Sequence, residues 1–522
     1  MLPNKRNGWA VLFLALTYAA LTVYCMDRWV GAYDEGVILT GAERFGAGDV
    51  IHRDFYAVYG IGNFAILSLL FDLFSHSVMV LRCFDTLIRA AIVALTFVLI
   101  RGAGSALAAW IGSGYIAAWL LAYGTYGYPV FPVLALALGS LLCLVPVFAG
   151  SQSSARLRCA GLLAGGVGLF RYDSGLYVFA SELVVLSVYS WTAGGKARVK
   201  STIAPYCIGL LLVAAPIGLV LVGTGALSDL LQQVILDPAR TYGTMRGLPI
   251  DWFSVGAILP IIGTASVALA VAAVFAKRGP HSSADYLLAV LLLLSVAFSV
   301  KGFVRFSPIQ MSAAMVTSVV ALGVMAGAPR FQTGALRLLV LASVLAYSTG
   351  IVSPISSSLA RALENLAVTD GDGRCSHRAE PDRLGCFRTN DERMSAVRYI
   401  VAATKPGTPL FVGLGRHDKV VVNDALFYFL ADRPSATKWH HMDPGVNTTE
   451  AVQRAIIAEL QASRPPYIVL ETQWDDVREP NGSAVSSGVE LLDRYIPSAY
   501  TRVQSYGTFQ ILRQTASIDP AP

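Results

Sequence analysis

Long apolar runs alternate with short polar segments from residue 9 to residue 352, and beyond that point the pattern stops. A run of about 20 apolar residues is long enough to cross the hydrocarbon core of a bilayer. No small-residue cleavage site follows the first run, so we expect it to persist as a helix. The runs predict eleven membrane-spanning helices, near residues 9–27, 79–100, 103–122, 130–149, 159–170, 175–192, 202–222, 253–275, 284–300, 307–328 and 334–352.

Lysine and arginine in the short loops predict the orientation of these helices, because basic loops stay in the cytoplasm. If the N-terminus is cytoplasmic, the loops on that side hold nearly no acidic residue. They hold the basic residues Lys5, Arg6, Arg101, Arg156, Arg158, Lys196, Arg198, Lys200, Lys277, Arg278, Arg330 and Arg337. This orientation places the first loop, residues 27–78, and the C-terminal tail outside the cytoplasm of a multi-pass plasma-membrane protein. The short apolar segment 61–76 is expected at the membrane interface.

The tail has a different pattern from the rest of the chain. Residues 353–390 are rich in Ser, Asp and Arg and are typical of a linker. Residues 391–522 alternate between helical and strand patterns, which predicts a small α/β domain. The predicted helices are 391–404, 423–433, 448–463 and 488–496, and the predicted strands are 409–413, 466–471, 500–507 and 509–514. The predicted fold is therefore a polytopic α-helical membrane module, residues 1–352, with an extracytoplasmic α/β domain.

Composition agrees with this division and removes one class of partner. The 522 residues are 55% hydrophobic and 14% charged, whereas a soluble domain carries about 25% charged residues. The net charge is only +6 and no basic cluster is interleaved with aromatic residues, so nucleic acid is not an expected partner.

Cys375 and Cys386 share the outer linker, where an oxidising compartment favours a disulfide. Two free thiols or half of a metal site are the alternatives.

The first loop contains the most polar stretch of the first 220 residues, AYDEGVILTGAERFGAGDVIHRDFYAVYG at positions 32–60. Asp34 and Glu35 follow the first span closely, and a carboxylate near the membrane surface can accept a proton from an attacking hydroxyl group. The alternative is that they cap a helix, because acidic residues stabilise helix N-termini. Asp54 is a second candidate base, and its alternative is a turn residue or an ion pair with Arg53.

Cations near the outer ends of later spans are candidate phosphate ligands. Arg171 and Asp173 interrupt the apolar sequence GLFRYDSGLY, and Lys301 and Arg305 lie in VKGFVRFSP. Charges at such depth are costly and mark functional sites, and arginine binds phosphate through two parallel hydrogen bonds. The alternative is that these side chains extend to the membrane surface.

The motif WHHMD, residues 439–443, offers two histidines to a metal, although adjacent histidines are usually ordinary loop residues. We assign no metal ligand and leave dependence on a divalent metal open.

The first loop resembles that of the GT-C glycosyltransferases, which include protein O-mannosyltransferases, lipid A aminoarabinose transferases and rhizobial-type lipid glycosyltransferases. The shared pattern is an acid pair, a helix with Ala and Gly, a basic-Asp-aromatic step and an arginine at the start of the next span. Here these are Asp34 with Glu35, Arg53-Asp54-Phe55 and Arg82. The segment YAVYGIGNF replaces a Lys-Pro-Pro-like step of the aminoarabinose transferases, which argues against the same acceptor.

The resemblance implies an inverting transferase that moves a hexose or pentose from a polyprenyl-phosphate carrier to a lipid, glycan or protein acceptor. By motif position, Asp34 is the general base, Glu35 supports it and Asp54 is a further catalytic candidate. We expect Arg171, Lys301 and Arg305 to face the leaving lipid phosphate, from their charge and predicted depth. Arg53, Arg82 and Asp173 complete the expected substrate-binding set. A transporter or flippase of lipid-linked sugars, or an assembly protein of the envelope, remains as an alternative.

Overall fold

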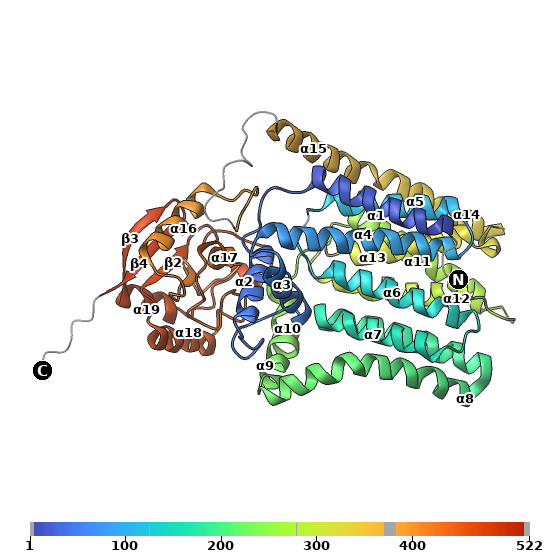
Figure 1. Ribbon diagram of the computed structural model, residues 1–522, viewed down its shortest axis with the longest axis horizontal. Helices are drawn as coiled ribbons and strands as arrows, with labels where there is room; N and C mark the ends of the chain where they lie inside the picture. The colour runs from blue at the N-terminus through green and yellow to red at the C-terminus, as the bar shows by residue number, and fades with distance from the viewer. Residues whose placement is uncertain (1–4, 125, 278, 333, 370–382, 516–522) are drawn as a thin grey trace, which may run out of the picture. The chain divides into compact units, whose positions relative to one another are not determined.

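A computed structural model describes residues 5–124, 126–277, 279–332, 334–369 and 383–515 (Figure 1). The chain divides into two compact units, each built from segments that are distant in sequence. The helical unit comprises Met1–Asp27, Cys83–Val220 and Pro249–Asp372. The mixed unit comprises Arg28–Arg82, Leu221–Leu248 and Gly373–Pro522. The first loop and the tail therefore fold together, which their separation in the sequence did not predict.

Apolar helices make up the helical unit, and Figure 1 shows most of them running along a common direction. Helix α13 is buried along almost its whole length and packs against α5, α11 and α12, while α6 packs against α7. The helices are α1 (Lys5–Cys25), α4 (Val78–Gly102), α5 (Ala106–Ala122), α6 (Val130–Phe148), α7 (Ser154–Phe170), α8 (Tyr172–Gly223), α11 (Val255–Phe275), α12 (Ser283–Val304), α13 (Ser312–Gly327), α14 (Gly334–Gly350) and α15 (Val352–Thr369), with the 3₁₀ turn η3 (Pro329–Phe331). The first five residues of α4 belong to the mixed unit.

Each of the eleven predicted spans coincides with a helix or half of one, but within the described residues seven helices are long and apolar enough to cross a membrane. Helices α5, α7 and α13 are 17, 17 and 16 residues long, which is short for a straight span. Two further predicted spans are joined in α8, whose 52 residues include a break at Gly194 and Gly195. The multi-pass architecture is confirmed, and the number of eleven crossings stays a prediction.

The expected linker begins with a helix rather than an irregular segment. Helix α15 uses polar side chains to bind the exposed carbonyl groups at the ends of two other helices. Arg361 donates to the carbonyl oxygens of Cys25 at 3.1 Å and Ala122 at 2.7 Å, and Asn365 donates to that of Tyr24 at 2.7 Å. The last carbonyl groups of a helix have no partner within it, so these bonds satisfy α1 and α5.

A four-stranded sheet organises the tail within the mixed unit, in the order β1-β2-β4-β3. Strands β1 (Phe411–Leu414) and β2 (Tyr467–Glu471) are parallel, and the helices α17 and α18 connect them, as a parallel pair requires. Strands β3 (Tyr500–Tyr506) and β4 (Phe509–Gln514) form an antiparallel hairpin. The helices of this unit are α2 (Asp34–Gly46), α3 (Ile61–Leu73), α9 (Leu227–Leu231), α10 (Asp237–Thr241), α16 (Asp391–Ala403), α17 (Leu426–Ala431), α18 (Glu450–Ser463) and α19 (Leu491–Ala499), with π-helical turns η1 (Gln232–Leu236) and η2 (Tyr242–Arg246) and the 3₁₀ turn η4 (Gly482–Ala484).

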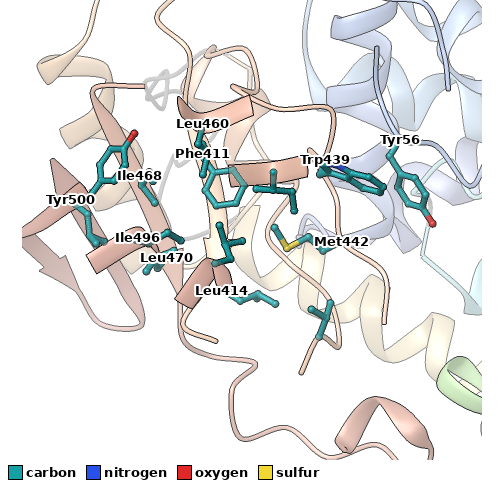
Figure 2. Packing of buried hydrophobic residues seen from close by; sticks show 14 of the residues in the cluster. Tyr56, Phe411, Leu414, Trp439, Met442, Leu460, Ile468, Leu470, Ile496 and Tyr500 are labelled. Atoms are coloured by element: carbon teal, nitrogen blue, oxygen red, sulfur yellow. The ribbon is translucent and has the colours of Figure 1, made fainter. Parts of the chain in front are cut away.

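The first loop contributes directly to the hydrophobic core of the tail. Figure 2 shows Tyr56 beside Trp439, and their ring centroids are 4.9 Å apart. The backbone nitrogen of Leu426 donates to the carbonyl oxygen of Ala32 at 3.0 Å. A Cβ atom on Gly36 would lie only 2.3 Å from that same nitrogen, so α2 needs glycine there to approach the start of α17. The acidic start of α2 is therefore fixed against the tail.

Candidate functional site

Asp34 is the first residue of α2 and is half-buried. The N-cap position belongs to Tyr33, whose side chain makes no capping hydrogen bond, so Asp34 is not the cap residue. A carboxylate in the first helical turn is still favoured by the helix dipole. The Tyr59 hydroxyl donates to Asp34 Oδ1 at 2.9 Å, which fixes the orientation of the carboxylate.

Glu35 and Arg82 form a bidentate ion pair in the interior of the mixed unit. Arg82 Nε donates to Glu35 Oε1 at 2.7 Å and Arg82 Nη2 donates to Oε2 at 2.9 Å, while both side chains are only 1% exposed. The backbone nitrogen of Gly31 adds a 2.9 Å bond to Oε2, and the Arg82 guanidinium lies over the Phe387 ring. This geometry favours a structural role for both residues over the expected catalytic and substrate-binding roles.

Arg53 and Asp54 form a second bidentate pair, on the surface. Arg53 Nε and Nη2 donate to the two carboxylate oxygens of Asp54, each at 2.8 Å, and Asp54 Oδ2 also accepts from the backbone nitrogen of Val50. The hydrogen bonds from Arg53 lower the pKa of Asp54. A turn residue with a lowered pKa is a weak base, so the geometry favours the alternative reading of Asp54 over catalysis.

A buried polar network that the sequence analysis did not find adjoins the start of α2. Arg246, in the π-helical turn η2, pairs with Asp443 and donates to the Tyr33 hydroxyl at 2.9 Å. Tyr33 in turn donates to Asp443 Oδ1 at 2.9 Å, and Tyr56 donates to Oδ2 at 3.1 Å. The network therefore joins the first loop, the segment 221–248 and the tail at the residue that precedes Asp34.

The charges in this network are held in fixed protonation states. Burial alone would raise the pKa of Asp443, but the charge of Arg246 and the hydrogen bonds from Arg246 and Tyr33 lower it. Burial, and then the negative charge of Asp443, raises the pKa of the Tyr33 phenol well above its usual value. The charge of Asp34 also acts on both Arg246 and Tyr33. Arg246 thus provides positive potential near Asp34.

The two histidines of the WHHMD motif are buried beside the same network. The ring centroids of His440 and His441 are 4.8 Å apart, and that of His441 is 4.8 Å from Tyr56. Burial lowers the pKa of His441 to about 4 and lowers that of His440 well below its usual value. Among the described residues, no group of three or more His, Cys, Asp or Glu side chains is arranged to hold a metal ion.

In the helical unit, three of the predicted substrate-binding residues converge. Arg171 directly follows α7, and its Nε lies 3.4 Å from Asp173 Oδ1 in the first turn of α8. Lys301, near the end of α12, pairs with Oδ2 of the same carboxylate. Tyr128 lies 3.5 Å from Arg171 Nη1 and is hydrogen-bonded to Gln310. Four segments of the chain thus meet in one polar group.

The structure gives little information about two further predictions, the role of Arg305 and the disulfide. Arg305 immediately follows α12 and is half-buried. The expected disulfide involves Cys375, which lies outside the described residues, so the pairing with Cys386 stays a prediction. Tyr59 and Asp443 lie in the segments YAVYGIGNF and WHHMD, but neither pattern indicates a role for them, and no motif marks Arg246. The sequence does contain one signal for Arg246, because few cations lie in the loops that are expected outside the cytoplasm.

Neither a protein-family model nor a curated protein matches the chain. Solved structures, however, match it along nearly its full length. ArnT from Cupriavidus metallidurans bound to undecaprenyl phosphate aligns with a TM-score of 0.55 and 17% identity, covering 99% of each chain. The archaeal oligosaccharyltransferase AglB from Archaeoglobus fulgidus, in complex with an inhibitory peptide and a dolichol-phosphate, aligns with a TM-score of 0.53 and 12% identity. That alignment covers 90% of this chain and 70% of AglB. Both are GT-C superfamily members, and the protein has the GT-C fold.

Proposed function

We propose that the protein is a glycosyltransferase that moves a sugar from a polyprenyl-phosphate carrier to an acceptor at the outer face of the plasma membrane. The observation that carries the proposal is the GT-C fold along the whole chain, combined with an acidic residue, Asp34, at the start of the first helix after the first apolar helix. The ArnT structure holds undecaprenyl phosphate and the AglB structure holds a dolichol-phosphate, which supports a polyprenyl-phosphate donor here.

Asp34 is the proposed general base. Its carboxylate accepts the proton of the acceptor hydroxyl as that oxygen attacks the anomeric carbon of the sugar. The bond between the anomeric carbon and the phosphate oxygen breaks on the opposite side, so the configuration inverts and the lipid phosphate leaves. Tyr59 holds one carboxylate oxygen of Asp34, and the Tyr33–Arg246–Asp443 network holds the start of α2. These residues position the base.

The lipid phosphate gains charge as it leaves, and fixed cations stabilise such charge strongly. Arg171, Lys301 and Arg305 are the proposed cations in the helical unit. Arg171 and Lys301 already converge on Asp173, so they are oriented before a substrate binds. An anionic phosphate can compete with Asp173 for the same donors, and arginine can bind it through two hydrogen bonds.

The proposed reaction requires the mixed unit to lie outside the cytoplasm, with the N-terminus inside. The asymmetry of basic residues between the predicted loops supports this orientation. A reporter that is active only in the cytoplasm, fused after residue 522, should be silent. The same reporter fused after residue 101 should be active, and the reverse pattern would overturn the orientation and the assignment of the base.

Transfer assays on the purified protein in vesicles test the proposal directly. A radiolabelled polyprenyl-phosphate sugar is added with a lipid extract that contains acceptor hydroxyl groups, and both the product and the sidedness of the donor are followed. Transfer of label with the wild-type protein, and its loss in Asp34→Asn, is the expected result. Movement of the donor across the bilayer without transfer or hydrolysis would favour the flippase and contradict the proposal. The acceptor class and the choice between hexose and pentose follow from the product.

A further inference from the structure

A cleft lies beside a break in helix α8, and the proposed reaction does not use it. The helix breaks at Gly194 and Gly195, and Gly195 has a φ of 63°, a left-handed conformation that favours glycine. The cleft beside this break has a volume of about 370 Å³ and is lined by Trp191, Lys196, Val199, Lys200, Ile203 and Ala204. Its walls are almost wholly apolar, formed by an aromatic ring, the methylene stems of the two lysines and short aliphatic side chains.

The break itself is stabilised independently of the cleft. Arg198 Nη2 donates to the Tyr189 hydroxyl at 2.9 Å, and its guanidinium lies 5.4 Å from the centroid of the Tyr189 ring. Tyr189 is buried, so this contact anchors the start of the second half of α8 to the end of the first half. Neither Lys196 nor Lys200 forms an ion pair with any described residue, and both are exposed. Their charges are therefore available to an anion from outside the chain.

The surface that continues from the cleft is apolar. Ile208, Leu211 and Leu212 follow the cleft along α8 and are 50–59% exposed. Exposed aliphatic residues on a helix of this hydropathy are suited to contact acyl chains. Tryptophan is enriched where acyl chains meet headgroups, and Trp191 is 59% exposed at the break. The cleft is thus an apolar groove bordered by an indole and two lysines, and an exposed apolar surface continues from it along α8.

We propose that this cleft binds the headgroup of an anionic phospholipid. Lys196 and Lys200 contact the phosphate, Trp191 packs beside the glycerol backbone, and one acyl chain follows Ile203 and Ile208. A zwitterionic lipid carries the same phosphate but also a cation that the two lysines repel, so charge selects the anionic lipid. The inference does not depend on the proposed glycosyl transfer, because none of these residues belongs to the candidate site.

Native mass spectrometry of the full-length protein tests this proposal. The protein is released from mixed micelles that contain dioleoyl phosphatidylglycerol and dioleoyl phosphatidylcholine in equal amounts, and the retained lipids are counted. The wild-type protein should retain one phosphatidylglycerol in preference to phosphatidylcholine. A basic residue near the surface contributes about fivefold to the affinity for an anionic lipid, so Lys196→Gln with Lys200→Gln should reduce the preference by about 25-fold.

The matched control is Arg156→Gln with Arg158→Gln, which removes the same charge from two exposed residues at the start of α7. This control should retain the wild-type preference within about twofold. If the double lysine variant does not fold, Lys200→Gln alone should reduce the preference by about fivefold. Equal retention of the two lipids by the wild-type protein would overturn the proposal. So would an unchanged preference in the folded lysine variants, or an equal loss in the arginine control.

Discussion

The Tyr59 hydroxyl donates a 2.9 Å hydrogen bond to Oδ1 of Asp34, although 25 residues separate them in the chain. Tyr59 is buried, so its hydroxyl has a fixed position. A hydrogen bond to a charged group is stronger than one between neutral groups, and it restricts rotation of the carboxylate. Within the mixed unit, this contact gives Asp34 a defined orientation at the first turn of α2.

Removal of this contact tests whether Tyr59 positions the base. Tyr59→Phe keeps the ring and its packing but deletes the donor, which is worth roughly 1.5–3 kcal/mol when the acceptor is charged. We expect kcat for glycosyl transfer to fall by about tenfold while KM for the donor lipid changes by less than about threefold. Tyr428→Phe is the matched control, because it deletes a buried hydroxyl that accepts from the backbone nitrogen of Val412 and lies outside the network at the start of α2. A rise in KM alone would instead indicate that Tyr59 contacts the substrate.

The buried pair of Glu35 and Arg82 predicts a loss of stability rather than of substrate binding. Glu35→Gln leaves the Arg82 guanidinium buried without its counter-ion, which costs on the order of 3–5 kcal/mol. Thermal unfolding of the detergent-solubilised protein should show a clear decrease in Tm. Glu450→Gln is the control, because Glu450 is 61% exposed in its pair with Arg454 and such exposed pairs contribute about 1 kcal/mol or less. A folded Glu35→Gln protein with wild-type Tm and weaker donor binding would restore Arg82 as a substrate ligand.

His441 makes the mixed unit sensitive to acid. Burial lowers its pKa from 6.5 to about 4, so the unfolded chain takes up a proton before the folded chain does as the pH falls. Above pH 6.5 His441 is neutral in both states and the free energy of unfolding is at its full value. Between pH 6.5 and 4 only the unfolded chain takes up the proton, which lowers the free energy of unfolding by about 3 kcal/mol. The His441→Gln variant lacks the imidazole that takes up this proton. The difference in Tm between the wild type and this variant should therefore shrink between about pH 7.5 and about pH 5.

The control for this comparison is Tyr56→Phe, whose ring packs against His441. Burial raises the pKa of the Tyr56 phenol well above 10, so it does not titrate in the same range. Its Tm difference from the wild type should stay constant over that pH range. A constant difference for His441→Gln as well would show that His441 is not held neutral in the folded state.

The predicted disulfide between Cys375 and Cys386 is testable by alkylation. Closing a loop of this size contributes on the order of 2–3 kcal/mol to stability. Alkylation of the denatured, unreduced protein should leave both cysteines unmodified, and prior reduction should expose both. Labelling of both without reduction would refute the pairing. Cys83, which is exposed and forms no disulfide with a described residue, provides the internal positive control for labelling.

The elements that the sequence predicted well have strong local patterns. Apolar runs predicted the helices of the helical unit, and alternation in the tail predicted α16, α17, α18 and α19 and all four strands. Helix α15 was missed because SPISSSLARALENLA mixes serines and charges with apolar residues, and its binding to the ends of α1 and α5 is a tertiary feature. Propensity alone does not reveal such contacts.

The candidate site was predicted only in part, for a related reason. Asp34 follows from its position in a motif, and Arg171, Asp173 and Lys301 follow from their isolation in apolar sequence. The partners of Tyr33 are 213 and 410 residues away along the chain, so no local pattern brings Arg246 and Asp443 to it. No local pattern indicated the pairing of Glu35 with Arg82 either, and this pair favours a structural role for both residues.

Replacement of the proposed base is the most direct test of the central claim. Asp34→Asn keeps the size of the side chain and removes the proton acceptor, and Asp34 is not the N-cap residue of α2. Loss of its interaction with the helix dipole costs only about 0.3–1 kcal/mol, so the variant should fold. Its rate of transfer from the labelled polyprenyl-phosphate sugar should fall by roughly 10²-fold or more, with donor binding retained. Asp54→Asn, the control, should keep a rate near that of the wild type. Wild-type transfer by a well-folded Asp34→Asn protein would contradict the account.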